Sequence, residues 1–398
     1  MAVLFLQGPM GPFFRKLVSK LKDQGREAYK IDFNGGDAWY SRGISSTPFT
    51  GTVQEWPDFL TAFVNDYKIN SICVFGDCRL YHRLAKTVTE KLGINFYAFE
   101  EGYIRPNHLT LEKNGVNGYS EIAIDGLPEW EDVDIPDENV MGGTLLNRVR
   151  YCFLYYNMVH FQSKKFPHYE HHRTLVRSFE TKSWFRALGR HYLYKFTEFG
   201  IQKNLIQHHD NQYFLVPLQV YNDAQLRFHS PYSSIEEFIR ATLNSFKQYA
   251  DKKDLIVFKH HPMDRGHCHY GELLDYLSVD LNLEGRIIYC HDQHLPTLLK
   301  HSKGVITINS TTAISAFYHS ASVKVMGEAF YDIKGLCSQQ SLDDFWKQPE
   351  PIDYELFLRL RNFLVNHGQV NASYNRKHNI STDAVIEQMK KNNMFLNS

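Results

Sequence analysis

The sequence predicts an α/β protein with two doubly wound, Rossmann-type domains. Short apolar runs alternate with amphipathic helical patterns twice along the chain, at 3–102 and again at 213–327, and most of these runs end in glycine or polar residues. The length of 398 residues leaves room for two such domains at roughly 150 residues each. Ligands of this fold class bind beyond the carboxyl ends of the strands, so the loops there are the first candidates for a site.

Each expected element follows from its own pattern of apolar residues. We expect strands at 3–6, 28–33, 71–77, 94–102, 213–220, 254–260, 286–291, 303–309 and 322–327. The helices between them are expected at 12–24, 55–67, 80–92, 234–250, 271–279, 295–301 and from Thr311 onward. The resulting domain boundaries are 1–142, a helical segment at 143–205, a second domain at 206–335, and a helical tail at 336–398.

Composition sets limits on the class of protein. Lys plus Arg and Asp plus Glu number 44 each, so the net charge points to no partner and gives no reason to expect nucleic acid. No apolar run approaches the roughly 18 residues of a membrane-spanning helix, and the run at 2–8 is too short for a signal peptide. Six scattered cysteines without a CxxC pair favour reduced thiols in a cytoplasmic protein.

The charges are unevenly distributed along the chain. Residues 121–138 hold eight acids and no Lys or Arg, whereas 145–205 hold eleven Lys and Arg against three glutamates, interleaved with His and aromatic residues. Such asymmetry indicates an anionic surface or ligand near the basic segment. The alternative is a solvated helical insert without a binding role.

A cationic loop follows the expected strand at 255–258. Lys259, His260 and His261 come directly after the apolar residues, and Pro262 prevents the strand from continuing. Cationic side chains at the carboxyl edge of a sheet can pair with a phosphate. The alternative is a solvated lysine beside a histidine whose hydrogen bonds are satisfied in the core.

A second loop, at 306–316, combines a strand end with a helix start. The strand ends at Asn309, Ser310 stands at the expected N-cap, and Thr311 and Thr312 begin the helix. Free backbone N–H groups and the positive end of the helix dipole favour an anion there. A simple serine cap is the alternative, but this loop and the cationic loop occupy equivalent places on one sheet and can converge on one phosphate.

Two further loops carry acids. Gln219 ends one strand, and Asp223 and Arg227 follow it, so Asp223 is either a nucleophile or base, or a turn and cap residue. The spacing alone does not decide between these alternatives.

The loop at 98–112 has two adjacent acids, Glu100 and Glu101, followed by Gly102 and Arg105. Side chains of neighbouring strand residues diverge, so at most one of the two acids points into a cleft, and which one stays open. Gly102 permits a close approach of the backbone. A solvated acidic turn is the alternative.

The loop after the first strand contains Gly8 and Gly11, whose spacing does not match the GxGxxG pattern of dinucleotide sites. An Asp-x-Asp occurs at 132–134, within the acidic stretch and without a preceding strand, so we interpret it as solvated surface. A zinc site built from 267–269, or from His291 and His294, lacks a matching distant ligand pair. We therefore expect no metal and no cofactor.

Two such domains in sequence, with their ligand loops facing one cleft, describe the GT-B arrangement of nucleotide-sugar glycosyltransferases. The loops also resemble a known family, the capsule polysaccharide biosynthesis and export proteins of the β-Kdo transferase group. The resemblance runs from about residue 3 to the tail. It is carried by FLQGPMGPFF (5–14), FNGGD (33–37), FGDCR (75–79), FEEGYIRP (99–106), QVYNDAQLR (219–227), KHHPMDRGH (259–267), TINSTTAISA (307–316) and VMGEAFYDIKGL (325–336).

The resemblance implies a reaction and its substrates. It implies a CMP-β-Kdo donor, a lyso-phosphatidylglycerol acceptor, and addition of a first Kdo with retention of configuration, on which capsule is carried for export. It also implies a cytoplasmic protein at the periphery of the inner membrane, with other capsule assembly enzymes as further partners. In this interpretation 1–142 is the acceptor domain, 143–205 faces the membrane and acceptor, and 206–335 binds the CMP-sugar.

The resemblance assigns roles residue by residue. Asp223 matches the proposed nucleophile, and Glu101 matches the acid of an acid–glycine pair, which we take as general base; Arg227 or Arg105 would hold the Kdo carboxylate. His261-Pro262 and Ser310-Thr311 match the CMP-binding motifs. The expected nucleotide-binding set is Lys259, His260, His261, Pro262, Asn309, Ser310, Thr311 and Thr312. The expected substrate-binding set is Gln219, Arg227, Glu100, Gly102, Arg105 and Gly8.

Two alternatives to this function stay open. One is a GT-B-fold CDP-glycerol-type transferase or sugar epimerase, because these enzymes also hold a phosphate with a His-Pro pair or a helix end. The other is a non-catalytic scaffold of a capsule export complex.

Overall fold

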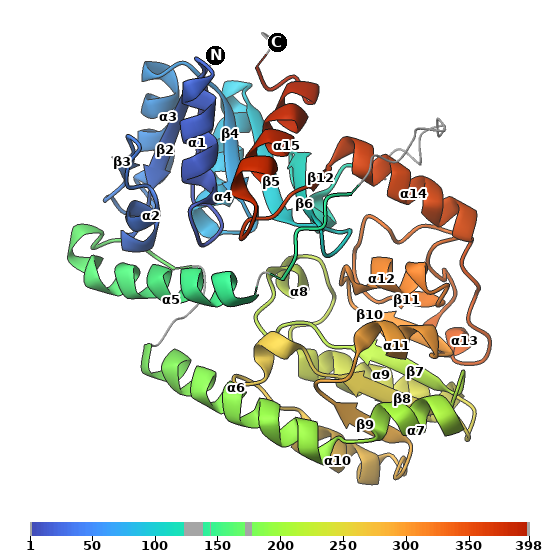
Figure 1. Ribbon diagram of the computed structural model, residues 1–398. Helices are drawn as coiled ribbons and strands as arrows, with labels where there is room; N and C mark the ends of the chain where they lie inside the picture. The colour runs from blue at the N-terminus through green and yellow to red at the C-terminus, as the bar shows by residue number, and fades with distance from the viewer. Residues whose placement is uncertain (1, 123–137, 144, 172–176, 396–398) are drawn as a thin grey trace. The chain divides into compact units, whose positions relative to one another are not determined.

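The computed structural model describes residues 2–122, 138–143, 145–171 and 177–395. The chain forms two compact units, one of residues 1–172 with 361–398 and one of residues 173–360. We call them the first and the second unit. Figure 1 shows a separate β-sheet in each.

The first unit is built on a seven-stranded sheet in which five strands form a parallel Rossmann core. β6 pairs antiparallel with β5, and β12 pairs antiparallel with β6. In spatial order the strands are β12 (Gln369–Asn371), β6 (His108–Lys113), β5 (Asn95–Glu101), β4 (Ile69–Phe75), β1 (Ala2–Phe5), β2 (Glu27–Asp32) and β3 (Thr47–Pro48).

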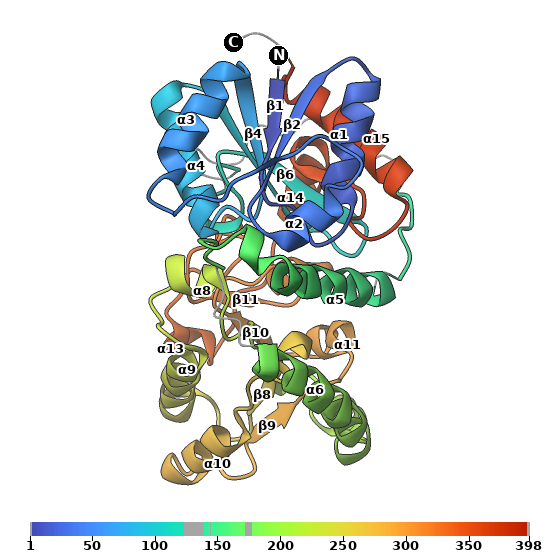
Figure 2. The ribbon, with the colours of Figure 1, turned by 90° about the vertical axis from the view of Figure 1, so that its left-hand side faces the viewer.

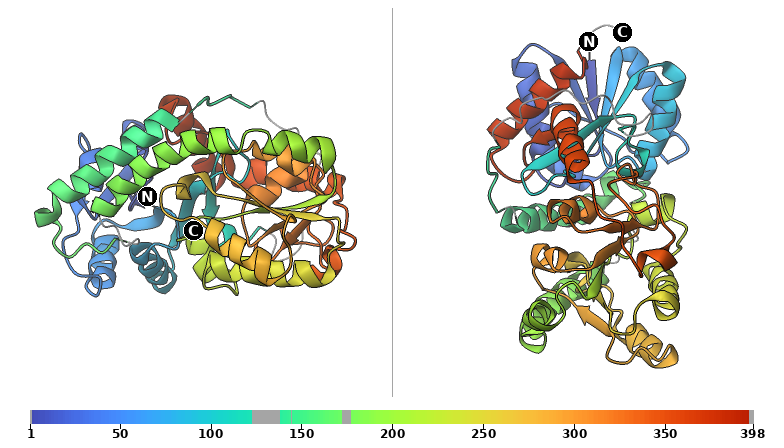
Figure 3. Two further views of the ribbon diagram at one scale, coloured as in Figure 1. Left: turned by 90° about the horizontal axis from the view of Figure 1, so that it is seen from below. Right: turned by 90° about the vertical axis from the view of Figure 1, so that its right-hand side faces the viewer.

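Helices cover both faces of this sheet. In Figure 2, α3 and α4 lie on one face and α1 and α15 on the other, and Figure 3 again shows the red α15 beside the blue α1. α1 faces the sheet because its apolar residues recur on one side, from Phe13 to Leu21. The helices of this unit are α1 (Phe13–Asp23), α2 (Gly35–Tyr40), α3 (Trp56–Asp66), α4 (Leu80–Leu92), α5 (Leu145–Phe161) and α15 (His378–Lys391).

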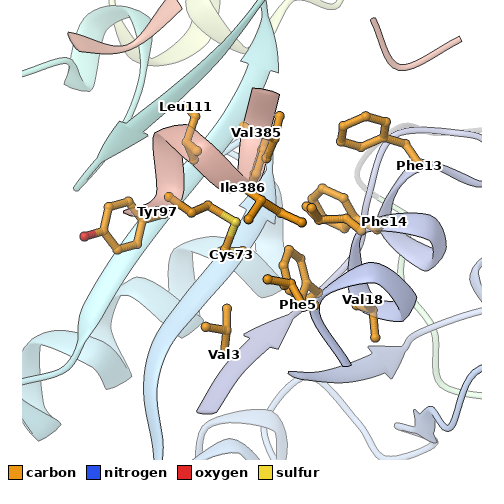
Figure 4. Close-up of a cluster of buried hydrophobic side chains, with 14 of the residues drawn as sticks. Val3, Phe5, Phe13, Phe14, Val18, Cys73, Tyr97, Leu111, Val385 and Ile386 are labelled. Atoms are coloured by element: carbon orange, nitrogen blue, oxygen red, sulfur yellow. The ribbon is translucent and has the colours of Figure 1, made fainter. Parts of the chain in front are cut away.

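The core between the sheet and the pair α1 and α15 joins residues that are far apart in sequence. Phe5 of β1 meets Phe14 of α1 with ring centroids 5.2 Å apart, and Val385 and Ile386 of α15 lie in the same cluster (Figure 4). Val385 and Ile386 are fully or almost fully buried. The C-terminal residues therefore complete the core of the first unit and do not form a separate tail.

The second unit has a five-stranded, wholly parallel sheet. Alternate residues of β7 face opposite sides, with Phe214 against Trp346 on one face and the hydroxyl of Tyr213 donating to the carbonyl of Leu298 on the other. The strands in spatial order are β11 (Val323–Val325), β10 (Gly304–Thr307), β7 (Tyr213–Pro217), β8 (Leu255–Lys259) and β9 (Ile287–Cys290).

Helices of the second unit lie on both faces of its sheet as well, so the predicted α/β class with two Rossmann-type domains is confirmed. α9, α10 and α13 share one hydrophobic cluster with β7 and β8. The helices are α6 (Arg177–Thr197), α7 (Ile201–His208), α8 (Ala224–Phe228), α9 (Ile235–Tyr249), α10 (Gly271–Asp280), α11 (Leu295–Lys300), α12 (Thr312–Tyr318) and α13 (Leu342–Phe345). The boundary between the units falls within α14 (Tyr354–His367).

The domain boundaries differ from the expected ones at two places. The segment 143–205 is not one body, because α5 belongs to the first unit and α6 and α7 belong to the second. The tail at 336–398 is divided in the same way, and β12 adds a strand to the first sheet. Both β6 and β12 were missing from the expected elements, and β12 is only three residues long, too short to show a period.

We predict that Ile386→Ala lowers the free energy of unfolding of the first unit by about 3 kcal/mol, since it leaves a cavity in a fully packed core. Ile380→Ala in the same helix is the matched control, because that side chain is 45% exposed. Urea denaturation monitored by circular dichroism measures both. Equal effects of the two substitutions would contradict the packing role of α15.

Candidate functional site

Both sheets have the same strand order, and this order locates a candidate site in each unit. Numbered along the chain within its unit, each parallel core runs 5-4-1-2-3, so the chain reverses direction across the sheet between the first and the fourth strand. These strands are β1 and β4 in the first unit, and β7 and β10 in the second. The crevice at the carboxyl ends of such a pair, the topological switch point, is where open α/β sheets bind ligands.

Three of the expected site residues meet at the switch point of the second unit. Gln219 follows β7 and Asn309 follows β10, and the Gln219 amide nitrogen donates to the Asn309 Oδ1 at 2.9 Å. The Asn309 backbone N–H donates back to the Gln219 Oε1 at 3.2 Å. The same Gln219 nitrogen lies 3.4 Å from Asp223 Oδ2. The two strand ends are therefore joined directly, and Asp223 is attached to their junction.

Asp223 is the N-cap of α8. Its Oδ1 accepts a hydrogen bond from the backbone N–H of Gln225 at 3.0 Å, while its Oδ2 faces Gln219. Asp223 therefore has the cap role that was one of the two alternatives left open by the sequence. The residue is only partly buried. A buried carboxylate, Asp264, accepts from the backbone N–H of Tyr221 at 2.7 Å and fixes the loop that leads to Asp223.

Asn309 also holds the two ends of α8 in place. Its side-chain nitrogen donates to the carbonyls of Gln225 at 3.1 Å and His229 at 3.0 Å. A single buried amide therefore connects β10, β7 and α8. A site built on strand ends and a tied helix is held more firmly than one on an open loop.

The cationic loop after β8 differs from the expectation. The Lys259 ammonium is buried and donates to the carbonyl of His291 at 3.0 Å, and burial lowers its pKa. His260 is buried with its Nδ1 2.7 Å from the Tyr289 hydroxyl, and burial lowers its pKa to about 3. His260 is therefore neutral at pH 7 and does not supply the expected positive charge.

His261 and Pro262 are the two residues of that loop that reach the surface. His261 caps a short turn at 262–264, and its Nδ1 accepts from the backbone N–H of Met263 at 3.2 Å. Pro262 opens that turn, in agreement with its expected role in ending the strand. Nucleotide binding by this loop stays a prediction, and among its three expected cations only His261 is partly exposed.

The loop after β10 starts its helix one residue later than expected. α12 begins at Thr312 with Thr311 at the N-cap position. Ser310 Oγ accepts from the backbone N–H of Thr312 at 3.2 Å and donates to its hydroxyl at 3.0 Å. The Tyr331 hydroxyl donates to the Ser310 carbonyl at 2.6 Å. These contacts fix the loop, and its role toward a phosphate stays a prediction.

In the first unit the structure separates Glu100 from Glu101. The Glu101 carboxylate pairs with Arg148 of α5 and is 37% exposed. The Glu100 carboxylate lies on the other side of β5, toward Gly76 and the end of β4, and its Oε1 accepts from the backbone N–H of Glu101 at 2.9 Å. Burial, together with the charges of Glu101 and Asp77, raises the pKa of Glu100 to about 7. Of the two glutamates, Glu100 is thus the one that lies near the switch point of this unit.

A buried polar network at the same switch point was not among the expected sites. Tyr155 of α5 accepts from Gln7 at 2.7 Å and from Asn34 at 2.8 Å, and donates to Asp37 Oδ1 at 3.1 Å. Burial raises the pKa of Asp37 to about 6. The motifs FLQGP and FNGGD supply these residues, so Gln7 is used to hold α5 over the end of β1. The two motifs are visible in the sequence. Their shared partner, Tyr155, lies more than a hundred residues further along the chain, so the sequence alone does not show that they meet.

The remaining expected substrate residues occupy different surroundings. A side chain at Gly8 would meet the Phe14 ring at 2.7 Å, and one at Gly102 would meet the His108 carbonyl at 2.2 Å, so both glycines permit close packing. Arg105 is exposed and donates to the Gly102 carbonyl at 3.2 Å. Arg227 lies exposed near the end of α8. Contact of these four residues with a substrate stays a prediction.

Within the described residues, no three or more His, Cys, Asp or Glu side chains gather as a metal site. The Asp-x-Asp at 132–134 lies outside those residues. All six cysteines lie inside them, and none forms a disulfide. No helix in the described ranges has both the length and the apolar character needed to cross a bilayer.

Two Rossmann-type units with polar side chains gathered at their switch points place this protein in the α/β class that binds ligands at strand ends. The family of capsule polysaccharide biosynthesis proteins matches residues 70–375. The chain is 41% identical to the capsule polysaccharide export protein KpsS of Escherichia coli, over 93% of this chain and 96% of that protein. The protein therefore belongs to the capsule polysaccharide biosynthesis family.

Other similar proteins are consistent with this family. The capsule polysaccharide modification protein LipB of Neisseria meningitidis serogroup B is 34% identical over 96% of each chain. Among solved structures, the β-Kdo 2,7 transferase part of Thermosulfurimonas dismutans KpsC aligns with a TM-score of 0.44 and 14% identity, covering 98% of this chain and 99% of that one. At this distance the structural likeness carries no argument about activity or substrate.

We predict that the stability of the first unit depends on pH through Glu100. Because its pKa is raised from the usual 4.5 to about 7, the folded protein keeps this proton in a range where the unfolded chain has lost it. The free energy of unfolding therefore falls as the pH rises from about 4.5 to about 7, by roughly 3 kcal/mol for this group.

Urea denaturation of wild type and Glu100→Gln at pH 5 and pH 8 measures this contribution, and the variant should lose that part of the pH dependence. Glu101→Gln is the matched control, since its carboxylate is exposed and paired with Arg148. An unchanged pH dependence in Glu100→Gln would show that Glu100 is solvated as an ordinary surface acid.

Proposed function

We propose that this protein is a retaining β-Kdo glycosyltransferase. It transfers Kdo from CMP-β-Kdo to a lyso-phosphatidylglycerol acceptor and so starts the linker on which capsule polysaccharide is exported. The observation that carries the proposal is the identity of 41% to a KpsS protein across nearly the whole chain, together with the meeting of Gln219, Asp223 and Asn309 at one switch point. The reaction is cytoplasmic, at the inner face of the inner membrane.

Asp223 is the proposed nucleophile. Retention by double displacement needs a carboxylate that attacks the anomeric carbon, C2 of Kdo, from the face opposite the leaving CMP. CMP departs with the bonding electrons as a phosphate monoester, and the acceptor hydroxyl then displaces Asp223. The contacts of Asp223 with the Gln225 N–H and the Gln219 amide orient one carboxylate oxygen each and keep the group at the sheet edge.

We propose that Glu101 or Glu100 takes the proton of the acceptor hydroxyl. The family resemblance assigns this base to Glu101, whereas its neighbour Glu100 has a pKa raised to about 7, the range in which a general base works well at neutral pH. Single Gln substitutions at each position, compared by kcat, separate the two. The donor carries one phosphate, so we propose that the reaction runs without a metal ion.

We predict that Asp223→Asn lowers kcat by at least about 10³-fold, because the amide cannot act as nucleophile. Asn is as good an N-cap as Asp, so this variant keeps α8 in place, and circular dichroism should show an unchanged fold. Mass spectrometry of lyso-phosphatidylglycerol incubated with protein, CMP-Kdo formed in situ and EDTA measures the product, which is heavier by one Kdo. Full activity in the variant would remove Asp223 from the mechanism.

The same assay tests the whole proposal. No product with either EDTA or Mg²⁺ would contradict a Kdo transferase and would favour the scaffold function. Release of CMP or CDP from a different donor would favour the CDP-glycerol-type or epimerase alternative.

A further inference from the structure

α6 has the reverse of the usual polarity of a surface helix. A helix on a globular protein normally turns its apolar side inward and its polar side to water. Among the described side chains of α6 and its C-terminal end, Ser183 and Glu198 are buried, whereas most of the large apolar side chains face solvent. Phe185, Phe196 and the following Phe199 are 73%, 85% and 89% exposed. We call the exposed set the α6 ridge, which consists of Phe185, Leu188, Tyr192, Leu193, Phe196 and Phe199.

The ridge is a continuous stripe along the helix. Its main members recur at intervals of three and four residues, the spacing that brings side chains onto one face of an α-helix. From Phe185 to Phe199 the stripe is about 20 Å long at 1.5 Å per residue. Exposed apolar surface of this extent, with this regular spacing, is typical of an interaction site.

Hydrogen bonds hold the opposite face of α6 against the second unit. Arg186 donates to the Gly266 carbonyl at 2.6 Å, and Arg190 donates to the Arg265 carbonyl at 2.8 Å. A side chain at Gly266 would lie 2.0 Å from the carbonyl of Ser183, so helix and loop touch at their backbones. These two arginines are therefore not free for lipid headgroups.

The end of α6 is fixed in the same way. Glu198 accepts from the backbone N–H of His291 at 2.9 Å and pairs with its ring, and Tyr194 stacks on that ring with centroids 3.6 Å apart. His191 bonds Asp292 at 2.9 Å. With its polar side engaged along its length, α6 cannot turn the ridge inward without breaking these bonds, so the ridge needs an apolar partner from outside.

The charges beside the ridge indicate which partner it meets. Lys182, Lys195 and Lys203 are exposed, and Glu198, the only acid between 182 and 203, is buried against His291. Apolar and aromatic side chains flanked by lysines are what a helix needs to lie in the interface of an anionic bilayer.

We propose that the α6 ridge inserts into the surface of an anionic phospholipid bilayer, with α6 parallel to the membrane plane. The inference rests on the proposed function, in which the acceptor is a phospholipid. It goes further by assigning the membrane contact to particular residues of the second unit. Because vesicle binding needs no catalysis, the membrane contact and the proposed transfer reaction can be tested and can fail separately.

Co-sedimentation with vesicles tests the inference. The full chain is mixed with phosphatidylcholine vesicles that contain or lack phosphatidylglycerol. Wild type should bind the anionic vesicles more tightly, and Phe196→Ser/Phe199→Ser should lose at least about tenfold in affinity. Tyr276→Ser/Val279→Ser in α10 is the matched control, because it removes two apolar side chains that are 59% and 66% exposed in the same unit. Equal binding by the two double variants would overturn the proposal.

A second readout does not depend on loss of binding. Phe196→Trp should show fluorescence quenching by brominated lipid in the anionic vesicles, whereas Tyr276→Trp should not. Quenching of both, or of neither, would contradict insertion of the ridge. A wild-type dimer that Phe196→Ser/Phe199→Ser converts to a monomer in light scattering, with vesicle binding unchanged, would assign the ridge to a second copy of the chain instead.

Transfer activity separates this inference from the proposed function. Normal transfer to a detergent-dispersed acceptor by a double variant that no longer binds vesicles would support both. Vesicle binding without any transfer would leave the ridge in place and remove the proposed reaction.

Discussion

The pair of hydrogen bonds between Gln219 and Asn309 is the contact on which the candidate site depends. It joins the ends of β7 and β10, where the sheet order reverses, and it holds Asp223 and both ends of α8 through the same two side chains. Each such bond contributes about 1 kcal/mol, but a buried amide left without its partner costs about 1–3 kcal/mol. The site is thus held in place because any looser arrangement would leave buried amides unsatisfied.

The same constraint shapes the rest of the molecule. In the first unit, Tyr155 satisfies Gln7, Asn34 and Asp37 and so fixes α5 over the end of β1. In the second unit, α6 is fixed by the hydrogen bonds of Arg186 and Arg190 to carbonyls of the loop after β8 and by the contact of Glu198 with His291. Both halves of the basic segment are therefore tied by polar contacts, each to its own unit, while some large apolar side chains of each, such as Phe153 and Phe196, remain exposed.

Much of the fold could be predicted from the sequence because both domains alternate apolar strands with amphipathic helices. Within the site, Gln219, Asp223 and Asn309 could be predicted because residues just after parallel strands share one edge of a sheet. The burial of Lys259 and the neutral state of His260 could not be predicted, because they depend on contacts with His291 and Tyr289, which lie about thirty residues further along the sequence. The raised pKa of Glu100 and the pairing of β12 with β6 likewise depend on tertiary packing, so the sequence does not show them.

We propose that the nucleotide of the donor binds at the switch point of the second unit. Hydrogen–deuterium exchange of the full chain with and without saturating CMP tests it most directly. Peptides covering 218–229 and 306–314 should become protected, since they contain Gln219, Asp223 and Asn309, while peptides of the first-unit sheet should not change. Protection confined to the first unit, or none at saturation, would contradict nucleotide binding at this switch point.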